Sequence, residues 1–248
     1  MKQSKIAVII PVYNAEKTLK SVLGRIPQDT LERITEFILV NDGSKDNTQE
    51  VIENLKQRYG NLVVITNRRN SGYGAAQKIG FKQALADNMD IVVLLHADGQ
   101  YPSEMIAEII GPIERGEADI VGGNRLIGKG AIRQGMPLLT YIGQVSLNAI
   151  ENFVFGKNLT IYHSGYRAYS RKALEKINFN SYSNCYAFDS EMLIGSFMNK
   201  LKIHELPIPT YYGQEVSYLN PIRYVGEIFL IMLKYLLRLY DTGKRENK

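Results

Sequence analysis

The pentapeptide His96-Ala97-Asp98-Gly99-Gln100 carries side chains that can bind a divalent cation. Asp98 and Gln100 offer oxygen atoms, which Mg²⁺ and Mn²⁺ prefer as ligands. His96 offers a neutral imidazole, which can ligate Mn²⁺ but brings no charge and suits Mg²⁺ poorly. A cation held here would neutralise negative charge on a bound phosphorylated ligand. Two interpretations of His96 stay open: contact with the metal or a phosphate, or a residue that only ends a buried strand.

Other side chains could bind the rest of a phosphorylated ligand. Guanidinium is a planar, always charged donor, so four arginines are candidates for phosphate: Arg69, Arg125, Arg133 and Arg167. For Arg69 and Arg133 the ordinary alternative is a solvated surface charge. Asp42 follows a strand-like run and could accept hydrogen bonds from a nucleobase edge or a ribose, although Asp42-Gly43 is also a favoured turn dipeptide.

Apolar, mostly β-branched runs alternate with helical stretches and predict an α/β fold with a Rossmann-like, mainly parallel central sheet flanked by helices. We expect strands at residues 6–10, 36–40, 62–65 and 90–95, with another beginning at residue 120. We expect helices at residues 16–25, 49–58, 75–86 and 138–155. Polar residues follow the first four strands, and ligands bind where the carboxyl ends of parallel strands meet. The sequence therefore predicts a binding site formed by four loops at one edge of the sheet.

Five segments stand in a specific order and spacing. They are Pro11-Val12-Tyr13-Asn14-Ala15-Glu16, Val40-Asn41-Asp42-Gly43-Ser44-Lys45-Asp46-Asn47-Thr48, Asn70-Ser71-Gly72-Tyr73-Gly74, Asp98-Gly99-Gln100-Tyr101-Pro102-Ser103-Glu104 and Ser164-Gly165-Tyr166-Arg167. Together they resemble the family 2 glycosyltransferases, in particular the dolichyl-phosphate mannose synthase-like branch, over about residues 5–215. The resemblance implies a GT-A fold and an inverting transfer (EC 2.4) from a UDP- or GDP-sugar, with Mg²⁺ or Mn²⁺ as cofactor.

The resemblance also implies roles for single residues. The nucleotide-binding set is Pro11, Tyr13, Asn14, Glu16, Asp42, Gly43, Ser44, Arg69, Gly72, Ala97 and Arg167. For two of these a structural role is the alternative, since Tyr13 could be a packed aromatic and Glu16 could favour a helix N-terminus. Asp98 and Gln100 would hold the metal with the diphosphate, and His96 stands where the family normally has the first of two acidic residues.

The catalytic set implied by the resemblance is Asp98, Arg125, Asp189 and Glu191. Asp189 and Glu191 match an acidic pair on a late helix near the acceptor, where a general base would deprotonate a hydroxyl. An acceptor that is a lipid phosphate is already an anion and needs no base. The alternative role for this pair is to favour a helix N-terminus by its negative charge.

Length and composition limit the class of protein. The 248 residues, 45% of them hydrophobic, suit one domain, which we place at residues 1–215, followed by an amphipathic helical extension and tail at residues 216–248. A net charge of +5 does not indicate nucleic-acid binding, and the single Cys185 excludes an internal disulfide framework. We expect a cytoplasmic protein. Residues 222–240 could lie on the cytoplasmic face of a membrane, or form a helix packed on the domain or a dimer contact.

The function that we expect is transfer of one sugar from a nucleotide-sugar donor to a polyprenyl or dolichyl phosphate. Transfer to a hydroxyl of a glycan in polysaccharide or glycoconjugate synthesis is the first alternative. A nucleotide-sugar-binding protein without catalysis is the second, because His96 departs from the acidic pattern. A nucleotidyltransferase is disfavoured, since no Gly-rich basic loop follows the first strand. Gly72-Tyr73-Gly74-Ala75-Ala76 also fails as a dinucleotide fingerprint, because Gln77 takes its last position.

Overall fold

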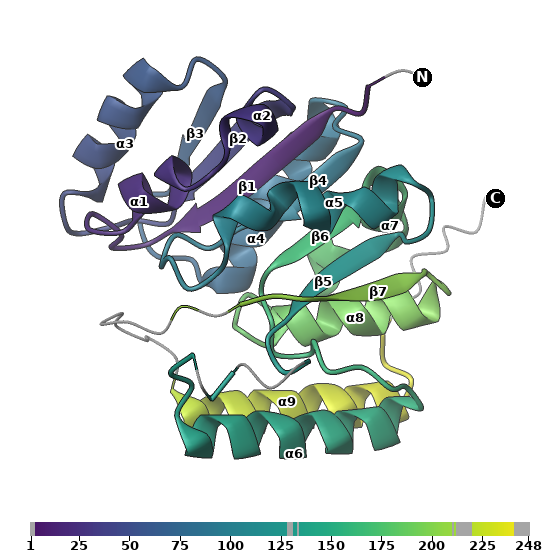
Figure 1. Cartoon of the computed structure of the whole chain (residues 1–248). Helices are drawn as coiled ribbons and strands as arrows, with labels where there is room; N and C mark the ends of the chain where they lie inside the picture. Colours follow the sequence, from purple (N-terminus) through teal and green to yellow (C-terminus); the bar gives the residue numbers. More distant parts are fainter. Residues whose placement is uncertain (1–2, 128–130, 133, 210, 212–219, 241–248) are drawn as a thin grey trace.

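A mixed sheet forms the centre of the molecule (Figure 1). The computed structural model describes residues 3–127, 131, 132, 134–209, 211 and 220–240. Among these residues the sheet has seven strands in the order β3-β2-β1-β4-β6-β5-β7. The strands are β1 (Ile6–Val12), β2 (Ile34–Asn41), β3 (Leu62–Thr66), β4 (Ile91–Leu94), β5 (Ile120–Asn124), β6 (Arg167–Ser170) and β7 (Ile203–Pro207).

The strand directions bring the predicted loops to one edge. Strand β1 pairs in parallel with β2, where Ile10 stands opposite Leu39, and with β4, where Ile9 stands opposite Leu94. Strand β2 pairs in parallel with β3, so the carboxyl ends of four strands lie at the same edge. Only β6 runs against its neighbours, β4 and β5, within the described residues. The predicted mainly parallel sheet is therefore confirmed.

Helices fill the connections between the strands. They are α1 (Leu19–Gly24), α2 (Gln28–Leu31), α3 (Thr48–Arg58), α4 (Tyr73–Ala86), α5 (Ile106–Glu114), α6 (Leu138–Phe155), α7 (Arg171–Lys176), α8 (Phe188–Met198) and α9 (Pro221–Leu236), with short 3₁₀ turns at Ser103–Met105 and Phe179–Ser181. The bounds expected for α6 are confirmed. The expected helix at residues 16–25 is wrong at its start, because the backbone at residues 14–16 bonds to the loop after β2 instead.

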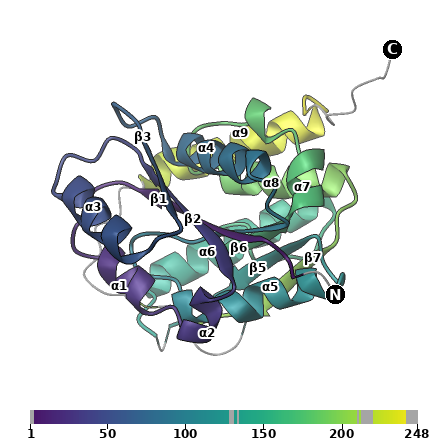
Figure 2. The same cartoon turned by 90° about the horizontal axis from the view of Figure 1, so that it is seen from above.

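Two hydrophobic cores lie on opposite faces of the sheet. Helices α1, α3 and α5 supply Leu19, Ile52 and Ile109 to the core on one face. Helices α4 and α8 supply Phe81 and Phe188 to the other, together with residues of α7. Figure 2 shows these two groups of helices on either side of the strands. The layers are therefore helix, sheet and helix, with the strand ends open between them.

Helices α6 and α9 form a further layer (Figure 1). They pack on each other and on α8 through a third cluster that includes Leu147, Phe155, Leu193 and Ile228. Helix α8 is buried along most of its length because it lies between this layer and the sheet. No helix among the described residues is long and apolar enough to span a bilayer. The expected domain boundary at residues 215 and 216 lies outside the described residues, as does Arg133.

Candidate active site

A hollow of about 510 Å³ opens at the carboxyl ends of β1, β2 and β3. Its volume suits a nucleoside-sized ligand, since small-molecule pockets usually measure about 300–1,000 Å³. The loops after the three strands line it with Tyr13, Asn41, Gly43, Ser44, Lys45, Gln49, Thr66, Asn67, Arg68, Arg69 and Asn70. Four residues of the predicted nucleotide-binding set, Tyr13, Gly43, Ser44 and Arg69, are therefore brought together here.

The loops after β1 and β2 are tied together by hydrogen bonds. The backbone N–H of Asn14 donates to Ser44 Oγ at 3.0 Å, and Asn14 Oδ1 accepts the backbone N–H of Lys45 at 2.8 Å. Glu16 Oε2 accepts the backbone N–H of Asn47 at 2.9 Å. Asn14 takes a positive φ of 50°, which asparagine tolerates better than most residues. Asn14 and Glu16 thus hold the rim of the hollow with their side chains instead of lining it.

Pro11 and Asp42 support the hollow from within the fold. Pro11 lies in β1 opposite Val40 of β2. The Asp42 carboxylate is buried and accepts four hydrogen bonds from the segment after β3: Asn67 Nδ2 at 2.7 Å, the backbone N–H of Ser71 at 3.0 Å to each oxygen, and the backbone N–H of Gly72 at 2.9 Å. Charge-assisted bonds of this kind are the stronger ones. Asp42 therefore fixes the loop that carries Arg69.

Two glycines allow the loops to approach this closely. Gly43 has a φ of +71°, and a Cβ there would lie 2.6 Å from the carbonyl carbon of Arg69. Gly72 has a φ of +105°, and a Cβ there would overlap the carbonyl oxygen of Asn184. L-residues with side chains rarely adopt these angles. Both glycines are therefore required by the backbone, whatever ligand binds.

The turn after β4 presents Asp98 and Gln100. Asp98 Oδ1 accepts the backbone N–H of Gln100 at 3.0 Å, and Gly99 at φ +81° completes the turn. Ala97 is buried beneath it. No described residue hydrogen-bonds the second carboxylate oxygen of Asp98. That oxygen is therefore available to a cation.

This turn fits a cation only as part of a larger ligand set. The described residues contain no group of three His, Cys, Asp or Glu side chains that could hold a metal ion. Mg²⁺ is commonly held by one or two carboxylates together with substrate phosphates and waters. Asp98 and the side-chain oxygen of Gln100 match such a site, in which a diphosphate would supply the remaining oxygens. The residues present therefore fit a metal bound together with a nucleotide.

His96, Tyr73 and Asp189 form a chain of hydrogen bonds beside the turn. The Tyr73 hydroxyl lies 2.7 Å from His96 Nε2 and donates to Asp189 Oδ2 at 2.8 Å. Gln77 Nε2 donates to the other oxygen, Asp189 Oδ1, at 3.1 Å. Burial lowers the pKa of His96, although the charges of Asp98 and Asp189 oppose it. Burial and the charge of Asp189 raise the pKa of Tyr73 well above its usual value.

Arg125 and Arg167 both lie inside the protein. Arg125 Nη2 donates to the carbonyl of His163 at 3.1 Å, and its guanidinium lies 5.1 Å from the centre of the Tyr101 ring. Arg167 has no exposed area and donates to the carbonyls of Asp189, Ile161 and Tyr162. The guanidinium of Arg167 is occupied by hydrogen bonds to backbone carbonyls inside the protein. The predicted phosphate contact of Arg167 does not agree with this placement. The role of Arg125 stays a prediction.

Asp189 and Glu191 do not act as a pair in the structure. Asp189 faces Tyr73, whereas Glu191 Oε2 accepts the backbone N–H of Ser183 at 2.7 Å and its hydroxyl at 2.6 Å. Glu191 Oε1 accepts the hydroxyl of Tyr240 at 3.1 Å. Side chains two positions apart on a helix do not face the same way. Glu191 therefore ties α8 to Ser183 and to Tyr240 in the C-terminal segment.

Sequence reasoning missed three residues that shape the site. Tyr73 and Gln77 hold Asp189, and the hydroxyl of Tyr101 accepts the backbone N–H of Gly165 at 2.9 Å. The ring of Tyr101 also stands edge-on to that of His96 at 5.0 Å between centroids. Tyr73 and Tyr101 lie within motifs that the sequence does single out. Their partners are distant in sequence, so only the folded structure identifies their contacts.

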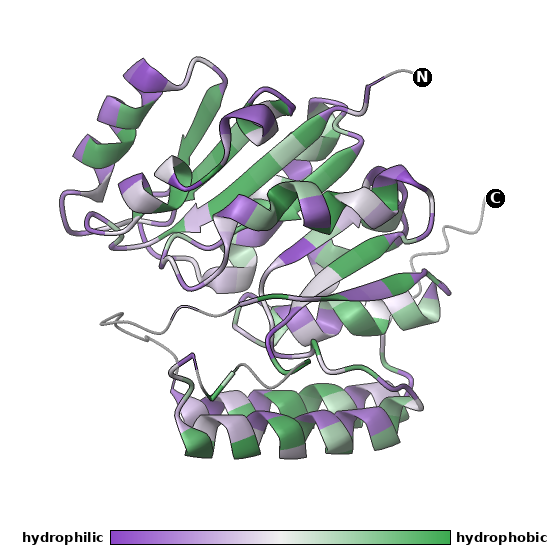
Figure 3. Ribbon diagram, viewed as in Figure 1, coloured by the Kyte–Doolittle hydropathy of each residue, from purple (hydrophilic) through white to green (hydrophobic). Residues whose placement is uncertain are grey.

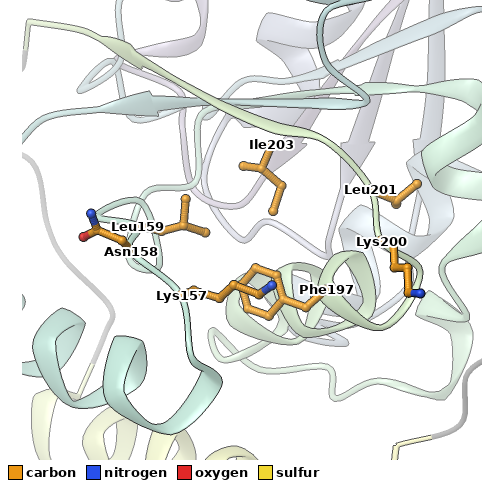
Figure 4. A pocket seen from close by; sticks show the side chains of 7 residues that line it. All are labelled: Lys157, Asn158, Leu159, Phe197, Lys200, Leu201 and Ile203. Atoms are coloured by element: carbon orange, nitrogen blue, oxygen red, sulfur yellow. The ribbon is translucent and has the colours of Figure 1, made fainter.

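A second hollow, of about 300 Å³, lies apart from these residues (Figure 4). It follows the ends of α6 and α8 beside β7 and is lined by Lys157, Asn158, Leu159, Phe197, Lys200, Leu201 and Ile203. The Lys157 ammonium group lies 5.1 Å from the centre of the Phe197 ring. No residue of the predicted site lines it, so the hollow at the strand ends is the candidate for the nucleotide.

Comparison with known proteins identifies the family. Residues 7–178 match the family model of glycosyl transferase family 2. This match covers more than half of the chain, and the chain therefore belongs to that family. It is a glycosyltransferase, as the motifs predict, and the resemblance drawn from them is confirmed.

Relatives and a solved structure agree with this assignment. The chain is 34% identical over 226 residues to UDP-N-acetylglucosamine--dolichyl-phosphate N-acetylglucosaminyltransferase of Methanococcus voltae, covering 86% of this chain and 88% of that protein. It is 29% identical over 212 residues to polyprenol monophosphomannose synthase of Mycolicibacterium smegmatis, covering 85% and 78%. Glucosyl-3-phosphoglycerate synthase from Mycobacterium tuberculosis, solved with Mn²⁺, uridine diphosphate and glucosyl-3-phosphoglycerate, has a TM-score of 0.66 at 21% identity and covers 97% and 82%. The predicted GT-A fold is confirmed.

Proposed function

We propose that this glycosyltransferase moves a sugar from a nucleoside diphosphate sugar to a polyprenyl phosphate, with inversion at the anomeric carbon. The hollow at the ends of β1, β2 and β3 carries the donor half of the proposal, because it lies at the same sheet edge as the Asp98 turn. Uridine is the favoured nucleoside, since the relative from M. voltae is named for a UDP-sugar and the M. tuberculosis structure holds uridine diphosphate.

The hydrogen bonds of the Asp189 and Glu191 carboxylates favour a phosphate as the acceptor. Both oxygens of Asp189 accept hydrogen bonds, from Tyr73 and Gln77. Both oxygens of Glu191 accept hydrogen bonds, from Ser183 and Tyr240. Both carboxylates are thus engaged by donors of the protein itself, and a phosphate acceptor needs no base, because it is already an anion. The relatives from M. voltae and M. smegmatis are named for dolichyl phosphate and polyprenol acceptors, which supports the same choice.

The roles of the residues follow from these placements. Tyr13, Ser44 and Arg69 would contact the nucleoside and its first phosphate from the loops of the hollow. Asp98 and Gln100 would hold a divalent cation, which neutralises the departing diphosphate when it is bound. Arg125 would face the acceptor phosphate, stacked on Tyr101. The acceptor oxygen then attacks the anomeric carbon on the side opposite the diphosphate, and the carbon–oxygen bond to the diphosphate breaks.

In this proposal the lipid acceptor docks at the layer of α6 and α9. Large apolar side chains on both helices are exposed, among them Leu139 (85%), Phe153 (90%) and Ile222 (87%), and Figure 3 shows the apolar colouring along this layer. Soluble surfaces rarely leave so many apolar groups together. The only charged residue of α6, Glu151, is fully buried, while Lys234 lies in the last turn of α9 and Arg238 follows that helix. We expect this face to rest on an anionic membrane surface.

A donor panel tests the transfer. The purified protein is incubated with UDP-glucose, UDP-galactose, UDP-GlcNAc or GDP-mannose and with Mn²⁺ or Mg²⁺, and release of the nucleoside diphosphate is followed with and without a short polyprenyl phosphate. We expect metal-dependent release from one donor that rises with the lipid, and loss of turnover of at least about a hundredfold in Asp98→Asn. Nucleoside diphosphate release at the same rate with and without the lipid would indicate that the acceptor is a hydroxyl. Binding without release would favour the binding-protein alternative.

Vesicle flotation tests the membrane contact. We expect the protein to float with vesicles that contain phosphatidylglycerol more than with phosphatidylcholine alone. Leu139→Ser with Phe153→Ser should abolish flotation and leave the melting temperature unchanged, because both side chains are exposed. A wild-type dimer in solution that becomes a monomer in this variant would show instead that the face joins two copies of the chain.

A further inference from the structure

The Tyr73 hydroxyl joins two residues that the sequence separates widely. It lies 2.7 Å from His96 Nε2, at the end of β4, and 2.8 Å from Asp189 Oδ2, on α8. Gln77, one turn further along α4 than Tyr73, donates to Asp189 Oδ1 at 3.1 Å. Asp189 is thereby held on both oxygens, and its direction toward Tyr73 is fixed. The three-residue chain is continuous from the buried carboxylate to the imidazole.

The protons available for the two hydrogen bonds of Tyr73 determine the tautomer of His96. An ionised carboxylate can only accept hydrogen bonds, and a tyrosine hydroxyl has one proton to donate. The proton of Tyr73 goes to Asp189, so His96 must supply the proton in its bond to the Tyr73 oxygen. His96 Nε2 therefore carries the hydrogen. In the neutral ring, Nδ1 then has a free lone pair.

The surroundings of the ring leave Nδ1 as the atom that can meet a ligand. A Cβ at Gly165 would overlap His96 Cε1 and Nε2, so the backbone of Gly165 covers that side of the ring. No described residue hydrogen-bonds Nδ1. The charge of Asp98, two positions further along the chain, acts on the same ring. His96 Nδ1 and the second carboxylate oxygen of Asp98, two positions apart in the chain, are therefore both without a hydrogen-bond partner among the described residues.

We infer that Asp189, acting through Tyr73, holds His96 in the Nε2–H tautomer, so that Nδ1 joins Asp98 as a ligand and the site selects Mn²⁺ over Mg²⁺. Metal-binding histidines commonly donate their other N–H to such a partner, which fixes the ring and its tautomer. An imidazole nitrogen suits Mn²⁺ better than Mg²⁺, which prefers oxygen alone. Asp189 and Tyr73 are then positioning residues for the metal ligand. The inference rests on the proposed metal-dependent transfer.

Nitrogen NMR of the metal-free protein tests the tautomer without any activity measurement. The protein is labelled with ¹⁵N-histidine, and the resonances of His96, His163 and His204 are assigned with single His→Gln variants. We expect the His96 ring to show a protonated Nε2 and a bare Nδ1. Tyr73→Phe should give a mixture of tautomers, and Tyr59→Phe, at another part of the fold, should change nothing. A protonated Nδ1 in the wild type would overturn the inference.

Binding of Mn²⁺ in the presence of UDP tests the ligand. Pulsed electron paramagnetic resonance should detect a directly bound ¹⁴N nucleus in the wild type and none in His96→Asp. Calorimetry with UDP should show Mn²⁺ bound more tightly than Mg²⁺, by about tenfold, with this preference reduced in His96→Asp and the Mn²⁺ affinity of Tyr73→Phe lowered about tenfold. Bound Mn²⁺ without a nitrogen ligand would refute the inference and leave the proposed transfer standing. Absence of any metal–UDP binding would refute the proposed transfer itself.

Discussion

The carboxylate of Asp42 accepts the backbone N–H of Gly72 at 2.9 Å across 30 positions of sequence. The same carboxylate accepts the backbone N–H of Ser71 and the side-chain amide of Asn67. These bonds close the segment after β3 over the end of β2. The wall of the hollow that carries Arg69 is therefore held by one buried acidic side chain.

Asp42→Asn should weaken donor binding. Asparagine keeps the size of the side chain but loses the charge and places an N–H group against backbone donors. Hydrogen bonds to a charged group contribute about 1.5–3 kcal/mol, so we expect the Kd for UDP to rise about tenfold or more. Isothermal titration calorimetry measures this change. Asp29→Asn, an exposed position on α2, is the matched control and should bind UDP like the wild type. Equal affinity in the two variants would contradict the role of Asp42.

Gly43→Ala should close the hollow. A methyl group there would lie 2.6 Å from the backbone of Arg69, which cannot move without releasing the bonds to Asp42. Gly116→Ala is a close control, because Gly116 has the same φ of +71° but has open space around its Cβ position. Both variants should lose some stability from backbone strain, of about 1 kcal/mol. Only Gly43→Ala should also lose UDP affinity; a similar loss in Gly116→Ala would show that strain alone is responsible.

Glu191→Gln should lower the stability of the protein and leave kcat unchanged. Glu191 holds Ser183 and Tyr240, so its removal loosens the C-terminal segment from α8. A loss of about 1–2 kcal/mol corresponds to a fall in Tm of roughly 3–6 °C for a chain of this size. Thermal unfolding and kcat are measured on the same preparation. Glu175→Gln, on α7 and half exposed, serves as the control. A large fall in kcat with unchanged Tm would instead give Glu191 a catalytic role.

Glu36→Gln should make stability less dependent on pH. Burial and the charge of Asp87 raise the pKa of Glu36 from 4.5 to about 7. The folded protein therefore binds this proton more tightly than the unfolded chain, and the stability that results is full below about pH 4.5 and is lost as the pH rises through 7. Glutamine cannot ionise, so the variant should melt about 1–3 °C higher than the wild type at pH 8, the gain being small because Glu36 is partly solvated.

The matching measurement for Glu36 is a pair of thermal melts, one at pH 5 and one at pH 8. At pH 5 the folded wild type keeps the proton, so most of the difference between wild type and variant should disappear. Glu53→Gln, an exposed position on α3, should show no difference at either pH. A difference in Tm between wild type and Glu36→Gln that is equal at both pH values would contradict the assignment.

The sequence by itself determined the sheet edge and the family. Apolar runs and the polar residues that follow them are local patterns, and parallel strands always bring their carboxyl ends to one edge. Tyr13, Gly43 and Arg69 could be placed at a common site for that reason, and the Asp98 turn could be placed beside it. Strands β6 and β7 escaped prediction because they are short and carry polar residues such as Arg167 and Glu205, so no apolar run marks them.

Only the tertiary structure decided which functional side chains face one another. Asp189 and Glu191 look alike in sequence, but Asp189 meets Tyr73, 116 positions away, and Glu191 meets Tyr240. Arg167 looks like a phosphate ligand and is buried against backbone carbonyls instead. Such partners depend on how α4 and α8 pack on the sheet, and packing brings together atoms that no local pattern relates. The sheet edge that holds the candidate site could therefore be predicted from the sequence, whereas the hydrogen bonds that orient His96 arise only from the packed helices.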